Sequence, residues 1–136
     1  MGNTQAQPPV NPPTERVRRN NNDNYSQNTK KIVQDFIDQN KVMIFSATYC
    51  PYCRIASKQF DKLNEPYKKL EMDTYFDSKL KFAAAVRELA EISDGMSFVP
   101  KVYVCGRYIG GGSEAKQLYE SGKLKELIEN CEKTYN

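Results

Sequence analysis

The 136-residue chain contains no histidine. Histidine is the usual general base near neutral pH, a frequent metal ligand and a common partner of a cysteine nucleophile, so these three arrangements are excluded. A reactive thiol in this chain would therefore need another means of activation.

Long apolar segments are absent as well. The longest runs, at residues 42–45 and 102–104, are far shorter than the ~20 residues that span a bilayer. The 20 basic and 17 acidic side chains are interleaved along the sequence, and the formal net charge is only +3. A nucleic-acid-binding protein would gather its basic residues on one face. We therefore expect neither a membrane span nor a nucleic-acid partner.

Cysteine is scarce, with four residues at positions 50, 53, 105 and 131. A small secreted scaffold held together by disulfides is usually denser in cysteine. The first seven residues are polar and Pro8 follows them, so no apolar signal peptide is seen at the start of the sequence. These features favour a reducing compartment, and we expect a cytoplasmic protein with catalytic thiols.

Residues 1–27 differ in composition from the rest of the chain. They contain four prolines, a run of three asparagines at 20–22 and few large apolar side chains. Such a segment cannot bury enough apolar surface to offset the entropy of ordering it, so we predict a disordered tail. A single domain is expected over residues 28–136, because this length is too short for two separate cores.

Within this domain, helical and extended patterns alternate. Apolar residues recur at helical spacing over 29–40, 50–63 and 79–92, and again in a closing helix that starts at Ser113. Runs typical of strands lie at 42–45, at 67–72 and in a hairpin over 101–109 that turns at Gly106. This order predicts an α/β domain in which helices cover a mixed sheet.

The most informative motif is Cys50-Pro51-Tyr52-Cys53, which lies where a predicted strand ends and a helix begins. The first turn of a helix has unpaired N–H groups and the positive end of the dipole, and both stabilise a thiolate. Pro51 suits the first helical position because its missing N–H is not needed there. Cys53 lies one turn further into the helix, which makes Cys50 the exposed attacking thiol and Cys53 the shielded resolving thiol.

A zinc half-site and a pair of structural thiols are the alternatives for this motif. Zinc would need two further ligands, and without histidine these would be Cys105 and Cys131 or carboxylates. Neither of these cysteines belongs to a second C-x-x-C pair, so we expect no metal. Cys131 falls on an apolar helix face and is expected to be a buried structural thiol.

In its motifs the chain resembles the glutaredoxins, a branch of the thioredoxin-fold oxidoreductases. Thioredoxins usually have Gly-Pro between the cysteines and a tryptophan before them, whereas this chain has no tryptophan. The resemblance implies a thioredoxin-like three-layer fold, with a four-stranded mixed sheet flanked by helices. The matching motifs appear in family order between about residues 30 and 133, and they are Phe45-Ser46, Cys50-Pro51-Tyr52-Cys53, Val99-Pro100, Ile109-Gly110-Gly111 and Ser113-Glu114.

The resemblance also implies a function, the glutathione-dependent reduction of protein disulfides and of protein–glutathione mixed disulfides. Glutathione would be the reducing co-substrate and disulfide-containing or glutathionylated proteins the partners. A monomer would act in electron transport and cell redox homeostasis. Pro51 and Gly110 are implied as structural residues of the active site. The implied glutathione-binding residues are Tyr52, Arg87, Val99, Pro100, Gly111, Ser113 and Glu114.

Several of these residues have a specific implied role. A cis Pro100 facing the thiols would turn the backbone of Val99 toward glutathione, the alternative being a trans proline at the start of a strand. Gly111, like Gly110, would let a ligand approach the backbone. The helix start at Ser113 and the Glu114 carboxylate would hold the γ-glutamyl end, the alternative being an ordinary turn with an acidic first helical turn. Tyr52 would either pack along the peptide or only cover the helix start.

Two departures from the family pattern concern the affinity for glutathione. Many glutaredoxins have a lysine where this chain has Ala47, and that lysine meets the glycine carboxylate of glutathione. Arg87 matches a family position that reaches the same carboxylate, so we expect it to replace this cation. The alternative for Arg87 is a surface pair with Glu91. Phe98 stands where threonine usually precedes Val-Pro.

Other functions remain as alternatives. The main one is a dimer that binds an iron–sulfur cluster through Cys50 and glutathione, although glutaredoxins of that kind mostly lack a proline at position 51. A thioredoxin-like reductase fed by a flavoprotein is another. Cys105, at the hairpin turn, would be open to glutathionylation if it is exposed.

The N-terminus carries a weaker signal. Met1-Gly2-Asn3 resembles a myristoylation start, but Ala6 stands where serine or threonine is preferred. If Gly2 were acylated, the arginines at 16, 18 and 19 would supply the second contact that weak membrane binding needs. The alternative is an unmodified soluble tail.

Overall fold

The computed structural model describes residues 19–135, with side chains from residue 27 onward. No helix in this range is long and apolar enough to cross a membrane. The elements follow one another in the order α1 (Arg19–Gln39), β1 (Val42–Ser46), α2 (Pro51–Lys62), β2 (Lys68–Glu71), α3 (Met72–Tyr75), α4 (Lys79–Glu91), β3 (Lys101–Val104), β4 (Arg107–Gly110), α5 (Gly112–Glu120) and α6 (Lys123–Glu129).

The four strands form one mixed sheet in the order β2-β1-β3-β4. Strand β1 runs parallel to β2 and antiparallel to β3, and it brings Phe45 opposite both Leu70 and Lys101. Strands β3 and β4 form the predicted antiparallel hairpin. The mixed four-stranded sheet expected from the sequence is therefore confirmed.

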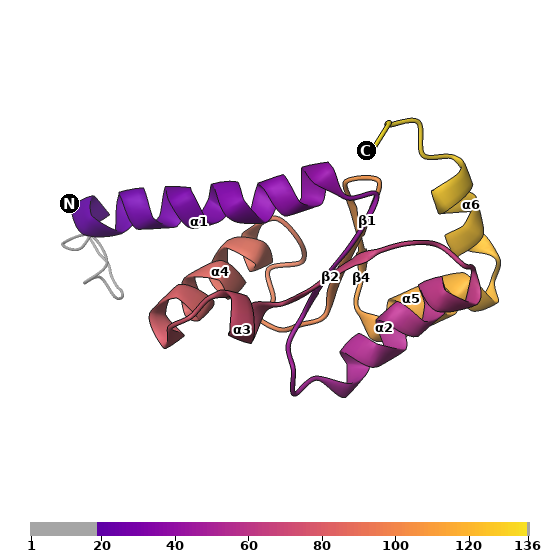
Figure 1. Cartoon of the computed structure of the whole chain (residues 1–136), viewed down its shortest axis with the longest axis horizontal. Helices are drawn as coiled ribbons and strands as arrows, with labels where there is room; N and C mark the ends of the chain where they lie inside the picture. Colours follow the sequence, from indigo (N-terminus) through magenta and orange to yellow (C-terminus); the bar gives the residue numbers. More distant parts are fainter. Residues whose placement is uncertain (1–18, 136) are drawn as a thin grey trace.

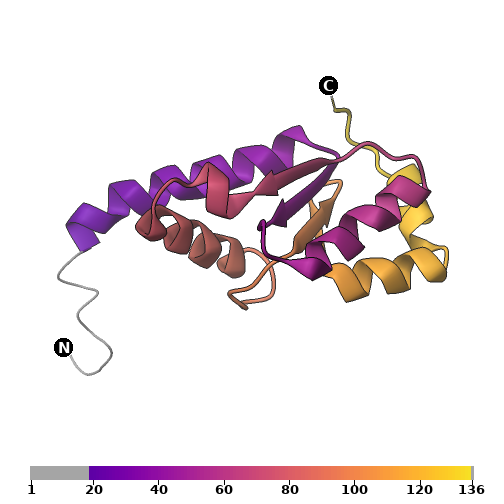
Figure 2. The ribbon, with the colours of Figure 1, turned by 60° about the horizontal axis from the view of Figure 1, so that its bottom comes forward.

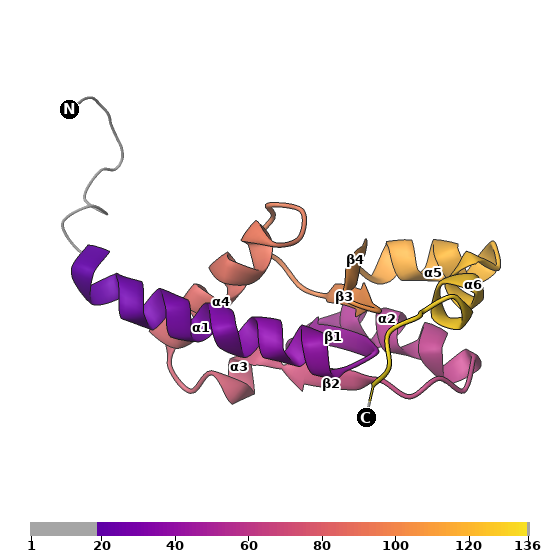
Figure 3. The same ribbon diagram turned by 90° about the horizontal axis from the view of Figure 1, so that it is seen from above.

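Helices cover both faces of the sheet, which gives three layers (Figures 1 and 2). Helices α1, α3 and α4 lie on one face, and α2, α5 and α6 lie on the other. Viewed from above, these two groups of helices stand at opposite ends of the molecule with the strands between them (Figure 3). Every residue of β1 is buried. Burial of a large apolar side chain stabilises a fold by about 1.5–3 kcal/mol. Because β1 is packed on both faces, its end and the loop that follows it are held in a fixed position.

Each face of the sheet has its own apolar core. On the α1 and α4 side the buried residues include Val33, Ile37, Phe45, Met72 and Leu89. On the α2 and α6 side they include Ile44, Phe60, Val102, Leu124 and Ile128.

Both ends of helix α4 are capped. The Ser78 side chain accepts a hydrogen bond from the Lys81 N–H at 3.1 Å, which caps the first turn. After the helix, Gly95 has a φ of +81° and its N–H donates to the Ala90 carbonyl at 2.8 Å. Glycine adopts this conformation without the penalty that a Cβ would bring.

Helix α1 begins earlier than predicted. Residues 19–27 fall within the predicted disordered tail of residues 1–27, but they are helical and continue into the predicted helix. Figure 1 shows these first turns reaching beyond α4. Once Val33 and Ile37 anchor the helix on the sheet, each added residue gains a backbone hydrogen bond, so the helix can extend toward its N-terminus. The rest of the predicted tail, residues 1–18 with the myristoylation motif, lies outside the described residues.

The predicted closing helix is divided into two. Helix α5 ends at Glu120, and Gly122 with a φ of +82° starts α6 in a new direction. The apolar face over Leu124 and Ile128 then packs on the sheet, as the sequence predicted.

The prediction for Cys131 was wrong, because Cys131 forms a disulfide with Cys105. Cys131 follows α6 and is only half-buried, and Cys105 occupies the hairpin turn with a φ of +55°. The fold brings their Cα atoms to 5.7 Å across 26 positions of sequence. Neither cysteine is available for zinc or for glutathionylation while this bond is intact. Disulfides outside active sites are rare in reducing compartments, so the cytoplasmic location stays a prediction.

Candidate active site

Cys50 is the N-cap residue of α2, and Pro51 is the first residue of that helix. The turn that leads into the helix is closed by the Cys50 N–H, which donates to the Ala47 carbonyl at 3.2 Å. Cys53 follows one turn later, and its N–H donates to the Cys50 carbonyl at 3.3 Å. The structure therefore brings both thiols to the start of a helix, as the motif predicts.

The two thiols differ in their surroundings. Cys50 is half-buried, whereas only 1% of Cys53 is exposed. Burial, followed by a hydrogen bond with Cys50, raises the pKa of Cys53 from 9.0 to about 11, although contacts with Ser46 and Ala47 act to lower it. Cys53 is thus a protonated, shielded thiol near neutral pH, and Cys50 is the thiol that solvent can reach.

The Val99–Pro100 peptide bond is cis, which confirms the expectation from the resemblance. The Val99 carbonyl group faces the active site, because the Cys50 thiol donates to its oxygen at 3.7 Å. Pro100 itself is buried. The main chain of Val99 therefore lies directly beside the reactive sulfur, where an extended peptide can pair with it.

The glycines at 110–112 are required by close contacts. Gly110 has a φ of +116°, and a Cβ there would approach the Cβ of Glu114 to 2.5 Å. A Cβ on Gly112 would come within 2.5 Å of the Tyr52 carbonyl oxygen, so this glycine allows α5 to pack against α2. Gly112 was not predicted as a site residue; its only sequence signal is its place in a run of three glycines.

The remaining predicted residues on this side are grouped around the start of α5. Gly111 lies against Pro100, because a Cβ there would stand 3.2 Å from the Pro100 carbonyl oxygen. The Gly111 N–H donates to Glu114 Oε1 at 2.8 Å, which closes the first turn of α5. Ser113 is exposed in the same turn. The γ-glutamyl role predicted for Ser113 and Glu114 stays a prediction.

A groove of about 380 Å³ runs past the Val99 main chain. It brings together Arg87 and Val99, two of the predicted residues, but not Tyr52, whose side chain is exposed elsewhere. In the described part of the chain Arg87 forms no ion pair with Glu91, so its guanidinium is open to a ligand. The lining residues are Tyr49, Phe82, Ala83, Val86, Arg87, Ser97, Phe98 and Val99.

Sequence reasoning missed a charged cluster under this groove. The side chain of Lys101 is 0% exposed, and its ammonium pairs with the carboxylate of Asp94. The ammonium also lies 4.2 Å from the ring centroid of Phe98 and 5.5 Å from that of Tyr108. This cation therefore links the strand after Pro100 to the Phe98 wall of the groove.

Asp94 is the acceptor that completes the cluster. Its carboxylate accepts hydrogen bonds from the Tyr108 hydroxyl at 2.9 Å and the Met96 N–H at 3.0 Å. Desolvation acts to raise the pKa of Asp94, but the bonds from Lys101, Met96 and Tyr108 outweigh it and lower this pKa from 3.8 to about 2. An ionised Asp94 thus holds the loop of residues 94–98 in place beside Val99. No local pattern in the sequence signals this arrangement.

Comparison with known proteins identifies the family. A sequence model described as Glutaredoxin matches residues 42–109. Glutaredoxin-1 of Saccharomyces cerevisiae is 38% identical over 107 residues, which cover 76% of this chain and 94% of the yeast protein. The chain belongs to the glutaredoxin family. Glutaredoxins are glutathione-dependent thiol–disulfide oxidoreductases, so the reaction class expected from the sequence is confirmed.

Further relatives and solved structures agree. Mitochondrial Glutaredoxin-2 of Mus musculus is 35% identical over 99 residues, which cover 73% of this chain but only 60% of that relative. The crystal structure of a buckwheat glutaredoxin–glutathione complex matches with a TM-score of 0.70 and 28% identity, covering 79% of this chain and 94% of that one. The holo form of glutaredoxin C1 from Populus tremula x tremuloides matches with a TM-score of 0.73 at 24% identity, covering 83% and 97%. These structures confirm the predicted thioredoxin-like fold.

Proposed function

We propose that this glutaredoxin reduces protein–glutathione mixed disulfides and protein disulfides, with Cys50 as the attacking thiol and Cys53 as the resolving thiol. The observation that carries the proposal is the contrast between the two sulfurs. Cys50 is accessible at the N-terminus of α2, whereas Cys53 is buried with a pKa of about 11. Only the first is suited to meet a substrate.

Removal of glutathione from a protein needs Cys50 and one further thiol. The Cys50 thiolate attacks the glutathione sulfur of the mixed disulfide, and the protein thiolate leaves and takes up a proton. A second glutathione thiolate then attacks the sulfur of the glutathione bound to Cys50. Glutathione disulfide leaves, and the Cys50 thiolate is restored.

Reduction of a protein disulfide also uses Cys53. Cys50 attacks one sulfur and forms a mixed disulfide with the protein, while the other protein sulfur leaves as a thiolate and is protonated. Cys53 then loses its proton and attacks Cys50, which releases the second protein thiol and leaves a Cys50–Cys53 disulfide. Two molecules of glutathione reduce this bond and are oxidised to glutathione disulfide.

The groove beside Cys50 is suited to glutathione as the co-substrate. The Val99 main chain lies beside the Cys50 thiol and would pair with the cysteine of glutathione. Arg87 lines the same groove as Val99 and would be the cation for the glycine carboxylate. The first turn of α5, with Ser113 and Glu114, would hold the γ-glutamyl end, as in the expectation from the sequence. Glu114 Oε1 already accepts the Gly111 N–H, so Oε2 is the oxygen for the α-amino group.

Two assays with cysteine variants test these roles. Cys50→Ser should abolish both deglutathionylation of a peptide and reduction of a protein disulfide. Cys53→Ser should keep deglutathionylation and lose most of the disulfide reduction. Equal loss of both activities in Cys53→Ser would refute the roles. A visible absorption spectrum of anaerobically purified protein tests the cluster-binding alternative, which would show iron–sulfur absorption that disappears in Cys50→Ser.

A further inference from the structure

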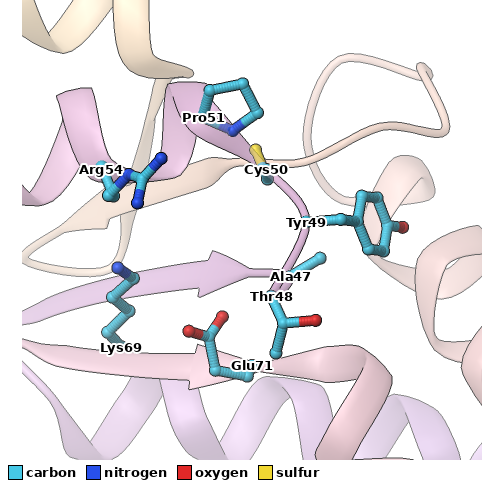
Figure 4. Close-up of a pocket in the computed structure, with 8 residues that line it drawn as sticks. All are labelled: Ala47, Thr48, Tyr49, Cys50, Pro51, Arg54, Lys69 and Glu71. Atoms are coloured by element: carbon cyan, nitrogen blue, oxygen red, sulfur yellow. The ribbon is translucent and has the colours of Figure 1, made fainter.

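A second pocket, of about 400 Å³, has Cys50 in its wall and shares only Tyr49 with the groove described above (Figure 4). Its floor and sides come from the loop after β1, from the first turns of α2 and from β2. The lining residues are Ala47, Thr48, Tyr49, Cys50, Pro51, Arg54, Lys69 and Glu71.

Three charged side chains enter this pocket. Lys69 and Glu71 are two positions apart on β2, so both point to the face of the sheet that α2 covers. Arg54 comes from α2, and Figure 4 shows its guanidinium and the Lys69 ammonium turned toward the same space, with the Glu71 carboxylate nearby. The pocket therefore combines two cations with one acceptor next to the reactive thiol.

These charged groups have no partners among the described residues. Neither Arg54 nor Lys69 forms an ion pair or a side-chain hydrogen bond there, and Glu71 Oε1 is buried without a hydrogen-bond donor. A buried acceptor left unsatisfied is unfavourable, and a ligand that donates to it would remove this penalty.

The charges select the kind of ligand. A carboxylate can bridge Arg54 and Lys69, but a simple anion offers no donor to Glu71. A peptide with an acidic side chain supplies both groups, because its carboxylate meets the two cations and a main-chain N–H is free to donate. Cys50 in the pocket wall places such a peptide at the sulfur where exchange occurs.

We propose that Arg54, Lys69 and Glu71 form a substrate subsite that binds an acidic side chain beside the target cysteine of a protein substrate. The inference rests on the proposed function, since it concerns the protein that Cys50 reduces. The glycine carboxylate of glutathione is the other source of the same chemistry, because Ala47 lines this pocket where many glutaredoxins have a lysine. Arg87 lies in the other groove and is the better placed cation for glutathione beside Val99.

Three glutathionylated peptides that differ only in the residue after the cysteine test this proposal. For the native enzyme, kcat/KM should fall in the order aspartate, asparagine, lysine, with about a five- to tenfold preference for aspartate over asparagine that shrinks at high salt. Lys69→Met and Arg54→Met should each bring the ratio of kcat/KM for the aspartate peptide to kcat/KM for the asparagine peptide close to one. Lys69→Glu should reverse it in favour of lysine. Lys58→Met, an exposed lysine of α2 outside the pocket, is the matched control and should leave the ratio unchanged.

Several results would overturn the proposal. The native enzyme could give equal kcat/KM values for the three peptides, or Lys58→Met could lose the preference for aspartate as fully as Lys69→Met does. Either result would show that the pocket does not recognise the residue after the cysteine. A rise in KM for glutathione in Lys69→Met, measured with the asparagine peptide, would assign the pocket to glutathione. Failure to turn over any of the peptides would refute the proposed function itself, whereas turnover without preference refutes only the subsite.

Discussion

Replacement of Asp94 by asparagine should destabilise the fold far more than replacement of its partner Lys101. Asp94→Asn leaves the Lys101 ammonium unpaired in a site with 0% exposure, and loss of one partner of a buried pair costs about 3–5 kcal/mol. Lys101→Met removes the buried charge itself. Asp94 is 31% exposed and keeps its bonds from Tyr108 and Met96, so this variant should lose only about 1 kcal/mol. The double variant should resemble Lys101→Met.

Urea unfolding followed by far-ultraviolet circular dichroism measures these differences, because the chain has no tryptophan to report on unfolding. With a urea dependence of about 1–3 kcal/mol per M, a loss of about 3–5 kcal/mol in Asp94→Asn should lower the midpoint by roughly 1–5 M. Because the double variant should resemble Lys101→Met, a double-variant cycle should give a coupling energy of about 3–5 kcal/mol. A loss below about 1 kcal/mol in Asp94→Asn, or simple addition of the two single effects, would refute the argument.

The same variant carries a pH signature. The pKa of Asp94 is lower in the folded protein, about 2 against 3.8, so its ionised form stabilises the fold. This contribution is complete above about pH 4 and is lost as the pH falls toward 2. The difference in the free energy of unfolding between native protein and Asp94→Asn should therefore shrink over this range, and a constant difference would contradict the assignment.

Three further changes have definite expected outcomes. Loss of the disulfide in a Cys105→Ser, Cys131→Ser variant should lower the free energy of unfolding by about 3 kcal/mol, because the bond closes a loop of 26 positions; an unchanged urea midpoint would contradict this. Arg87→Ala should raise KM for glutathionylated substrates about five- to thirtyfold, and Ala47→Lys should partly restore it, whereas an unaltered KM would exclude the carboxylate role. Gly112→Ala should cost about 1–3 kcal/mol in thermal or urea unfolding, since its Cβ would meet a carbonyl oxygen of α2 at 2.5 Å; a neutral effect would show that α5 shifts freely.

The parts of the structure that sequence reasoning predicted depend on local chemistry. The C-x-x-C motif at a helix start and the hairpin each involve neighbours in the chain, so spacing and residue type are sufficient. The cis Val99–Pro100 bond was expected only from the resemblance to the glutaredoxins. The order of helices and strands follows in the same way from apolar periodicity.

Sequence reasoning missed features that depend on residues far apart in the chain, or on helices that cover both faces of the sheet. Cys105 and Cys131 are 26 positions apart, and no spacing rule joins them. The alternating pattern of β3 suggests one exposed face, but helices cover both sides of this central strand, and Lys101 becomes buried among Asp94, Phe98 and Tyr108. The start of α1 is set by helix propagation, which a composition-based prediction of disorder does not consider.

If Cys50 carries the glutathione intermediate, that intermediate can be trapped on it. Cys53→Ser, which lacks the resolving thiol, would be mixed with a glutathionylated peptide, and the adduct would be located by mass spectrometry after proteolysis without reductant. We expect one glutathione per chain, on Cys50, and none in Cys50→Ser. Glutathione on any other residue, or none on Cys50 while the peptide is still reduced, would contradict it.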